Sequence, residues 1–109
     1  MQSRIAGKQI EIGEALPQHV RERLSAQVGK YFDRDAEASV TFMKQRAGFR
    51  ADCSVHLSSG ASVHARGAGR DAHKAFAAAL DHLKTRVRRY MRRLKNHHAR
   101  GGQTPATRA

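Results

Sequence analysis

The chain has 109 residues, and its 21 Lys and Arg against 9 Asp and Glu give a formal net charge of +12. This length suits one compact domain, and so large a positive charge attracts polyanions, with nucleic acid the first candidate partner and an acidic membrane surface the second. The absence of Trp, with only four Phe and two Tyr, argues against a large aromatic platform for stacking single-stranded bases.

The N-terminal part of the chain is predicted to form a short strand and then an amphipathic helix. Residues 2–8 are expected to be extended. Apolar residues then recur every three or four positions, which predicts a helix that begins at Gly13 or Glu14 and weakens at Gly29. Pro17 is tolerated in this helix because it lies in the first turn. The apolar stripe of the helix comprises Leu16, Val20, Leu24, Val28 and Tyr31 or Phe32.

The middle of the chain alternates apolar and polar residues, which predicts three strands of an antiparallel meander with one covered face. Turns are expected at residues 46–48 and 58–60, and residues 67–71 are expected to break the last strand. The side chains predicted to face the core are Ala38, Val40, Phe42, Ala51, Cys53, Val55, Leu57, Val63 and Ala65.

A long helix is predicted to follow the strands, with Asp71 as its N-cap. It is expected to run to about Asn96. Residues 101–109 are small and polar, so we expect them to be disordered. The apolar stripe of this helix comprises Ala72, Phe76, Ala79, Leu80, Leu83, Val87, Tyr90, Met91 and Leu94.

The predicted order of elements is therefore β-α-β-β-β-α. The first strand most simply joins the second in parallel, through a right-handed crossover. Both helices then cover one face of a four-stranded sheet, which makes the fold class α+β and the architecture a two-layer sandwich.

The last helix is basic to an unusual degree. Between residues 70 and 100, only Asp71 and Asp81 oppose a run of Lys and Arg. Like charges stand four residues apart, as in Arg88 and Arg92, at a cost of roughly a few tenths of a kcal/mol per pair. Something other than helix stability must account for this pattern.

A row of phosphate contacts is the functional interpretation of this basic helix. Arg outnumbers Lys there, which suits bidentate recognition of phosphate and stacking on bases. The plainer interpretation is a solvated basic face with no ligand. If the two helices lie side by side, cations of the first helix would extend the patch. The predicted RNA-binding residues are Arg23, Lys30, Lys74, Arg86, Arg88, Arg89, Arg92, Arg93 and Lys95.

The sequence offers little support for a catalytic or metal site. His56 and His64 could meet across the last hairpin, but there is no HExxH or CxxC spacing, so we expect no metal. Cys53 is the single cysteine and falls on the inward phase of its strand, which favours an inert, buried thiol. We find no catalytic triad, paired carboxylates or phosphate-binding Gly loop, so we expect no enzyme activity and no cofactor.

The cellular compartment of the protein can be inferred by elimination. A single cysteine excludes an intramolecular disulfide and suits a reducing environment. The N-terminus lacks the layout of a signal peptide, and the longest apolar run, residues 75–80, is too short to span a membrane. We therefore expect a cytoplasmic protein.

Two stretches resemble the ribosome hibernation promoting factors, also called ribosome-associated inhibitors. Residues 7–16 resemble the opening of that family, and residues 71–95 resemble its second helix without a gap. The resemblance covers about residues 3–96 and implies the same β-α-β-β-β-α fold. It also implies entry into the channel between the head and body of the small ribosomal subunit. There the basic helix would contact ribosomal RNA where tRNA and mRNA lie, and translation would be blocked by occupancy.

The resemblance also implies roles for individual residues. The basic positions of the family carry over best to Arg89, Arg93 and Lys95, and Arg88 stands at a more variable one. The positively charged residues Arg23 and Lys30 match basic positions in the first helix of the family. In contrast, His82, Thr85 and Met91 stand where the family often has Lys or Arg.

The expected domain organisation follows the same resemblance. We expect a ribosome-binding domain over residues 1–98, and a flexible polar tail or the start of a linker over residues 99–109. Some members of the family carry a further C-terminal domain that pairs two ribosomes. Residues 1–109 should lack that domain and its pairing activity.

Three alternatives stay open from the sequence. A general double-stranded-RNA-binding domain has an α-β-β-β-α order that is contained in this one, but the turn at residues 46–49 lacks the Gly-Pro-x-His loop of such domains. A basic module that docks on an acidic protein would show little preference for RNA. A small nuclease using His56 and His64 would cleave RNA.

Overall fold

A computed structural model describes the backbone of residues 1–32 and 35–103 and the side chains of residues 1–32 and 35–95. The sheet has the strand order β1-β2-β3-β4; β1 pairs with β2 in parallel, and the other two pairings are antiparallel. The elements are β1 (Gln2–Lys8), α1 (Ala15–Val28), the 3-10 turn η1 (Gly29–Tyr31), β2 (Glu37–Gln45), β3 (Gly48–His56), β4 (Ser62–Gly69) and α2 (Ala72–Gln103).

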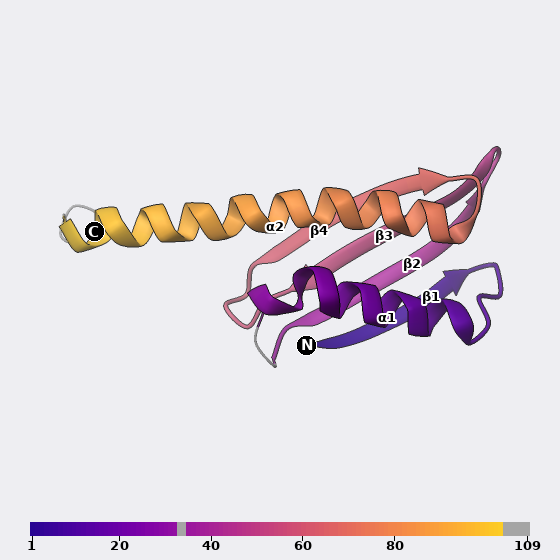
Figure 1. The fold of residues 1–109 in the computed structure, drawn as a ribbon, viewed down its shortest axis with the longest axis horizontal. Helices are drawn as coiled ribbons and strands as arrows, with labels where there is room; N and C mark the ends of the chain where they lie inside the picture. The colour runs from indigo at the N-terminus through magenta and orange to yellow at the C-terminus, as the bar shows by residue number, and fades with distance from the viewer. Residues whose placement is uncertain (33–34, 104–109) are drawn as a thin grey trace.

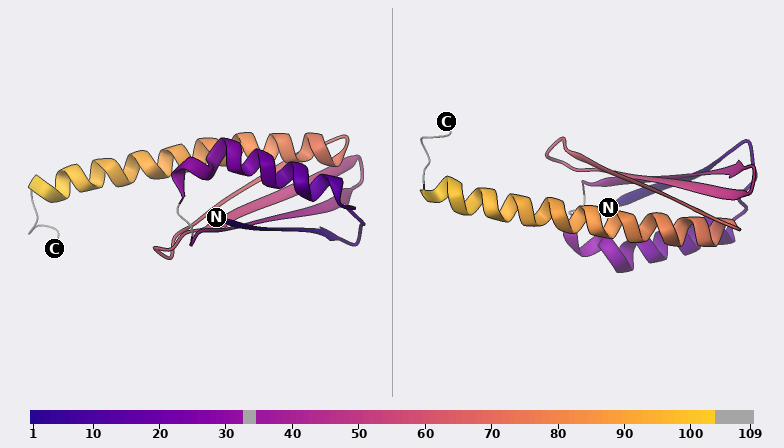
Figure 2. Two further views of the ribbon diagram at one scale, coloured as in Figure 1. Left: turned by 60° about the horizontal axis from the view of Figure 1, so that its bottom comes forward. Right: turned by 90° about the horizontal axis from the view of Figure 1, so that it is seen from above.

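Both helices lie on one face of the sheet, and the opposite face is left open (Figures 1 and 2). The parallel pairing of β1 with β2 arises because α1 crosses over that face between them. The predicted two-layer α+β sandwich is therefore confirmed.

Helix α1 buries the apolar stripe that its sequence predicts. Gly13, which adopts a φ of 68°, turns the chain into the helix, and Glu14 is the N-cap residue without a side-chain hydrogen bond. The four aliphatic side chains of the stripe are buried, and full burial of such a side chain contributes roughly 1.5–3 kcal/mol. They are Leu16, Val20, Leu24 and Val28.

The sheet contributes the other half of the core. The inward positions predicted from the alternation are all buried, from Ala38 in β2 to Ala65 in β4. Phe42 of β2 and Phe76 of α2 meet at the centre, with their ring centroids 6.4 Å apart. Because only one face is apolar, the register is strongly fixed, since a slip by one residue would expose this entire set.

Glycines let α2 lie unusually close to β4. We expected residues 67–71 to break the last strand, and the strand does end within this interval, but later than its first glycine, because β4 continues to Gly69. A methyl group on Gly67 would collide with the backbone nitrogen of Ala79, and one on Gly69 would lie 2.7 Å from that of Ala75. Both glycines therefore mark a close approach of the helix to the strand, and Gly69 is also the last residue of β4.

Helix α2 begins as predicted and ends later. The backbone N–H of Lys74 donates to Oδ1 of Asp71 at 2.8 Å, which confirms the N-cap. The helix continues to Gln103, past the expected end near Asn96. Residues 96–100 include no Gly or Pro, and the helix also includes Gly101 and Gly102. Residues 99–103 of the expected tail are therefore helical, and residues 104–109 lie outside the described residues. Figure 1 shows α2 projecting well past the sheet.

Candidate nucleic-acid interface

The predicted cations of α2 lie on its solvent side. The helix buries one stripe against the sheet, centred on Phe76, Leu83 and Val87. Apart from Lys84, which is half-buried, the cations from the helix start to Lys95 are exposed. The exposed predicted residues of α2 are Lys74, Arg86, Arg88, Arg89, Arg92, Arg93 and Lys95.

These cations have no acidic partner within the described part of the chain. The ion pair found there joins Arg50 and Asp52 of β3, at 3.0 Å between Nε and Oδ1, and no cation of α2 up to Lys95 takes part in one. Unpaired guanidinium groups on a helix are costly to place side by side. They are available to a polyanion, whose phosphates accept bidentate hydrogen bonds from Arg.

Helical geometry divides these cations into two rows. Arg86, Arg89 and Arg93 follow one another at three and four residues and so share the side of α2 that faces β4. Lys84 and Arg88 stand four residues apart on the side that faces α1. The two rows flank the solvent-facing line of the helix.

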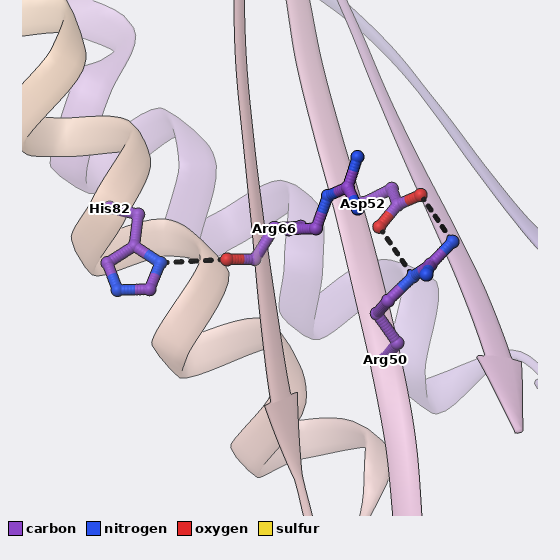
Figure 3. Close-up of polar contacts among 4 residues, drawn as sticks. All are labelled: Arg50, Asp52, Arg66 and His82. Carbon is purple, nitrogen blue, oxygen red and sulfur yellow. Dashed lines mark hydrogen bonds and ion pairs between the residues drawn. The ribbon is translucent and has the colours of Figure 1, made fainter. Parts of the chain in front are cut away.

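The row toward β4 lines a groove of about 300 Å³ between helix and strand. The guanidinium of Arg86 anchors the groove, since its Nη1 donates to the backbone carbonyl of His64. One turn earlier, Nδ1 of His82 donates to the carbonyl of Arg66 at 2.7 Å (Figure 3). Both bonds satisfy outward-facing carbonyls of the edge strand β4. The side chains along the groove are Ser62, Val63, His64, Arg86, Arg89, Tyr90 and Arg93.

The row toward α1 meets a predicted residue of that helix. The helices run side by side (Figures 1 and 2), and Arg23 and Lys84 line one small hollow of about 130 Å³ between them, together with Asp81. Because the two helices lie side by side, Arg23 extends the basic patch of α2 onto α1, as the sequence predicts for this arrangement. Lys30 lies farther along, on η1, with its ammonium 5.3 Å from the ring centroid of Tyr31.

The structure places one predicted RNA-binding residue, Lys74, apart from the groove at β4. It also places two residues beside the helix cations, His64 and Arg66, that the sequence did not single out for RNA binding. Lys74 stands in the first turn of α2, well away from the groove at β4. His64 lines that groove, and the exposed Arg66 follows it on β4. The alternation of apolar and polar residues predicts that both side chains lie on the outer face of the sheet. Their place beside the helix cations depends on the register and on the position of α2, which the sequence does not give.

The two histidines considered for a metal or a nuclease site are not opposite each other. The register sets His56 against Ser62 and His64 against Ser54, and Nδ1 of His56 lies 3.0 Å from the hydroxyl of Ser62. In residues 1–32 and 35–95, no three His, Cys, Asp or Glu side chains are grouped so that they could hold a metal ion.

Cys53 is buried in the sheet, with 3% of its surface exposed. Burial, with a smaller contribution from the charge of Asp52, raises the pKa of the thiol from 9.0 to about 12. Because the thiolate is the reactive form, this cysteine is inert at ordinary pH.

Comparison with known proteins now decides the family. Residues 3–95 match the family model described as "Sigma 54 modulation protein / S30EA ribosomal protein". The chain belongs to this family. Family membership agrees with the expectation that the protein is not an enzyme. The match includes all the RNA-binding candidates and all four strands except Gln2, the first residue of β1.

Members of the family in several bacteria are similar to this chain. A ribosome hibernation promotion factor of Rhizobium meliloti is 39% identical over 103 residues, which cover 94% of this chain and 54% of that protein. A ribosome hibernation promoting factor of Escherichia coli K12 is 30% identical over 97 residues, 89% of this chain and all (100%) of that protein. The chain therefore spans about half the length of the Rhizobium relative and the whole of the Escherichia one.

Solved structures show the same fold. The N-terminal domain of Protein Y from Thermus thermophilus superposes with a TM-score of 0.71 at 28% identity, covering 83% of this chain and 99% of that one. A ribosomal subunit interface protein from Coxiella burnetii gives a TM-score of 0.73 at 18% identity over 84% of this chain and 98% of that one, and its likeness concerns the fold alone. In the described residues of this chain, no helix is long and apolar enough to cross a membrane.

Proposed function

We propose that this protein is a ribosome hibernation factor that binds ribosomal RNA of the small subunit in the tRNA and mRNA channel and blocks translation by occupancy. The observation that carries the proposal is the exposed, unpaired cation face of α2 in a chain of this family. The relatives named as hibernation factors support the same role. The protein would act in the cytoplasm, without a cofactor.

The chemistry of the face suits RNA backbone rather than base sequence. Guanidinium groups bind phosphate oxygens in pairs, and a folded RNA surface presents many phosphates in a fixed pattern. The groove at β4 adds hydroxyl and imidazole groups from Ser62 and His64, which bond phosphates and ribose hydroxyls. A ligand held in this way would exclude tRNA and mRNA without any reaction. We assign no role in pairing ribosomes to the described domain.

Co-sedimentation with separated ribosomal subunits tests this proposal. We expect the protein to pellet with small subunits at physiological salt, in the presence of excess unrelated duplex RNA. Reversing two charges of the β4-side row, Arg89→Glu with Arg93→Glu, should remove most of this binding because two phosphate contacts become repulsive.

The matched control reverses two exposed cations at the turn between β2 and β3, Lys44→Glu with Arg46→Glu. It changes the net charge equally but lies outside the proposed surface, so it should bind more tightly than the helix variant. Equal binding by the two folded variants would contradict the assignment of the helix face. Loss of the wild-type protein to the duplex competitor would instead favour a general double-stranded-RNA-binding domain.

A further inference from the structure

The open face of the sheet is polar, and exposed Arg residues stand at both of its edges, Arg4 on β1 and Arg66 on β4. The register aligns side chains in rows across the strands. Ser39 of β2 stands opposite Ser54 of β3, which stands opposite His64 of β4. In the next row, Thr41 stands opposite Asp52, and Asp52 opposite Arg66. In these two rows, hydroxyl groups and the carboxylate of Asp52 stand on the middle strands β2 and β3, and an imidazole or a guanidinium stands at the β4 edge.

These rows form a shallow hollow of about 520 Å³ on the open face. Its floor is low because Ser and Thr side chains are short, and its rim is high because Arg and His side chains are long. Floor and rim are built from Ser39, Thr41, Ser54, His64, Arg66 and Arg86.

The single carboxylate in the hollow is already paired. Nη2 of Arg50 donates to Oδ2 of Asp52 at 3.2 Å, and Nε of Arg50 lies 3.0 Å from Oδ1 at ion-pairing distance (Figure 3). This pair neutralises Asp52. Arg66 extends over the same strand from β4 (Figure 3), is exposed, and forms no ion pair with an acidic side chain in the described part of the chain. The hollow is consequently left with a net positive rim.

The hollow is continuous with the groove along α2. His64 and Arg86 line both. A surface path therefore leads from Arg89 and Arg93 on the helix, past the β4 edge, to the hydroxyl floor formed around Ser39. An extended polyanion lying on the helix cations would meet cations and hydroxyls along this path, with no acidic group unpaired.

We propose that a second stretch of RNA backbone lies across the β4 edge and in this hollow, so that the domain is held by RNA on both its helical layer and its open sheet face. Arg66 and His64 bind phosphate oxygens, and the hydroxyls of Ser39, Ser54 and Thr41 bond phosphates or ribose 2′-hydroxyls. This inference rests on the proposed function and names a further binding surface for it. Phe, Tyr and Trp are absent from the outward strand positions, which favours backbone contact over base stacking.

Arg66→Gln and Arg4→Gln form a matched pair for testing the second surface. Both residues are exposed, and Arg4 belongs to the row of Ser39 on the far strand β1, outside the hollow. Each change removes one charge from the same face. We would measure the dissociation constant for isolated small ribosomal subunits at several KCl concentrations, after checking the fold of each variant by circular dichroism.

We expect Arg66→Gln to weaken binding about tenfold, the loss expected for one charge-assisted hydrogen bond, and to lower the salt slope by about one. Arg4→Gln should bind like the wild type. A second variant, Ser39→Asp, places an anion on the floor and should also weaken binding. Equal affinities for the Arg66 and Arg4 variants, whether both lost or both retained, would overturn the second surface. A wild-type protein that does not bind small subunits would overturn the proposed function itself.

Discussion

The guanidinium of Arg86 stands where α2, the β4 edge and the open sheet face meet. Its Nη1 donates to the carbonyl of His64, and its side chain lines both the groove along α2 and the hollow on the open face. The Nη1 atom of Arg86 therefore helps to hold α2 against β4. The neighbouring Arg66 and Arg89 carry no such bond in the described structure, which makes them cleaner probes of RNA contact.

Cys53 gives a prediction that concerns the core alone. Because burial raises its pKa to about 12, the native protein should react very slowly with iodoacetamide at mildly alkaline pH, and denaturant should make the reaction fast. Mass spectrometry of the alkylated chain measures both rates. Rapid modification of the folded protein would show that the sheet opens locally at β3.

The same pKa shift fixes the sign of a pH effect on stability. The folded-state pKa lies above the value of 9.0 for the free thiol, so the unfolded chain loses this proton first as pH rises. The stability contributed by the buried, protonated thiol is complete below pH 9.0 and is lost as pH approaches about 12.

At the scale of elements, the packing of α2 on β4 sets the position of the proposed interface. The helix is held close by Gly67 and Gly69 and tied at the strand edge by His82 and Arg86. A shift of α2 would move the row of Arg86, Arg89 and Arg93 relative to β4. The groove therefore depends on glycines that touch no ligand.

Two glycine substitutions should differ in their effect on the stability of the fold. Gly67→Ala should destabilise the protein by about 1–3 kcal/mol or more, because the added methyl meets the backbone of α2. Gly29→Ala should be neutral or stabilise by roughly 0.4–1 kcal/mol, because Gly29 has helical φ and ψ of −58° and −30° and its added methyl would make only ordinary contacts. Urea unfolding of both variants measures the difference. A neutral Gly67→Ala would contradict the close approach described for α2.

Much of this element-level picture could be predicted from periodicity. Alternation between Ala38 and Ala65 identified the buried face of each strand, and the helical stripes identified the buried faces of α1 and α2, because burial imposes those periods. The role of Gly67 could not be predicted, since a strand glycine is compatible with either a break or a close contact. The late end of α2 at Gln103 was not predicted, because Gly101 and Gly102 are poor helix formers and the helix nevertheless includes both.

The candidate site was only partly predictable for a related reason. Charge counting identified the cations of α2, since a one-sided run is visible in the sequence. The contribution of His64 and Arg66 depends on which strand stands at the edge and on the register of β3 with β4. Those are tertiary properties, so the groove at the β4 edge and the hollow on the open face emerged only from the structure.

At the scale of the whole molecule, the two layers carry charge on both outer surfaces. The helical layer presents the exposed cations of α2, and the open sheet face presents the positive rim at β4. A net charge of +12 speeds encounter with any polyanion, but the placement of that charge on adjoining surfaces suits an RNA-lined channel. Binding of this kind should weaken steeply with added salt.

Competition with tRNA on the small subunit is the most direct test of binding in the tRNA and mRNA channel. We would load isolated small subunits with a short mRNA and a fluorescent tRNA and then titrate the protein while following tRNA release. We expect the wild-type protein to displace the tRNA, and we expect the variant with Arg89→Glu and Arg93→Glu not to do so at the same concentration. A stable complex that holds both the protein and the tRNA would contradict binding in the channel.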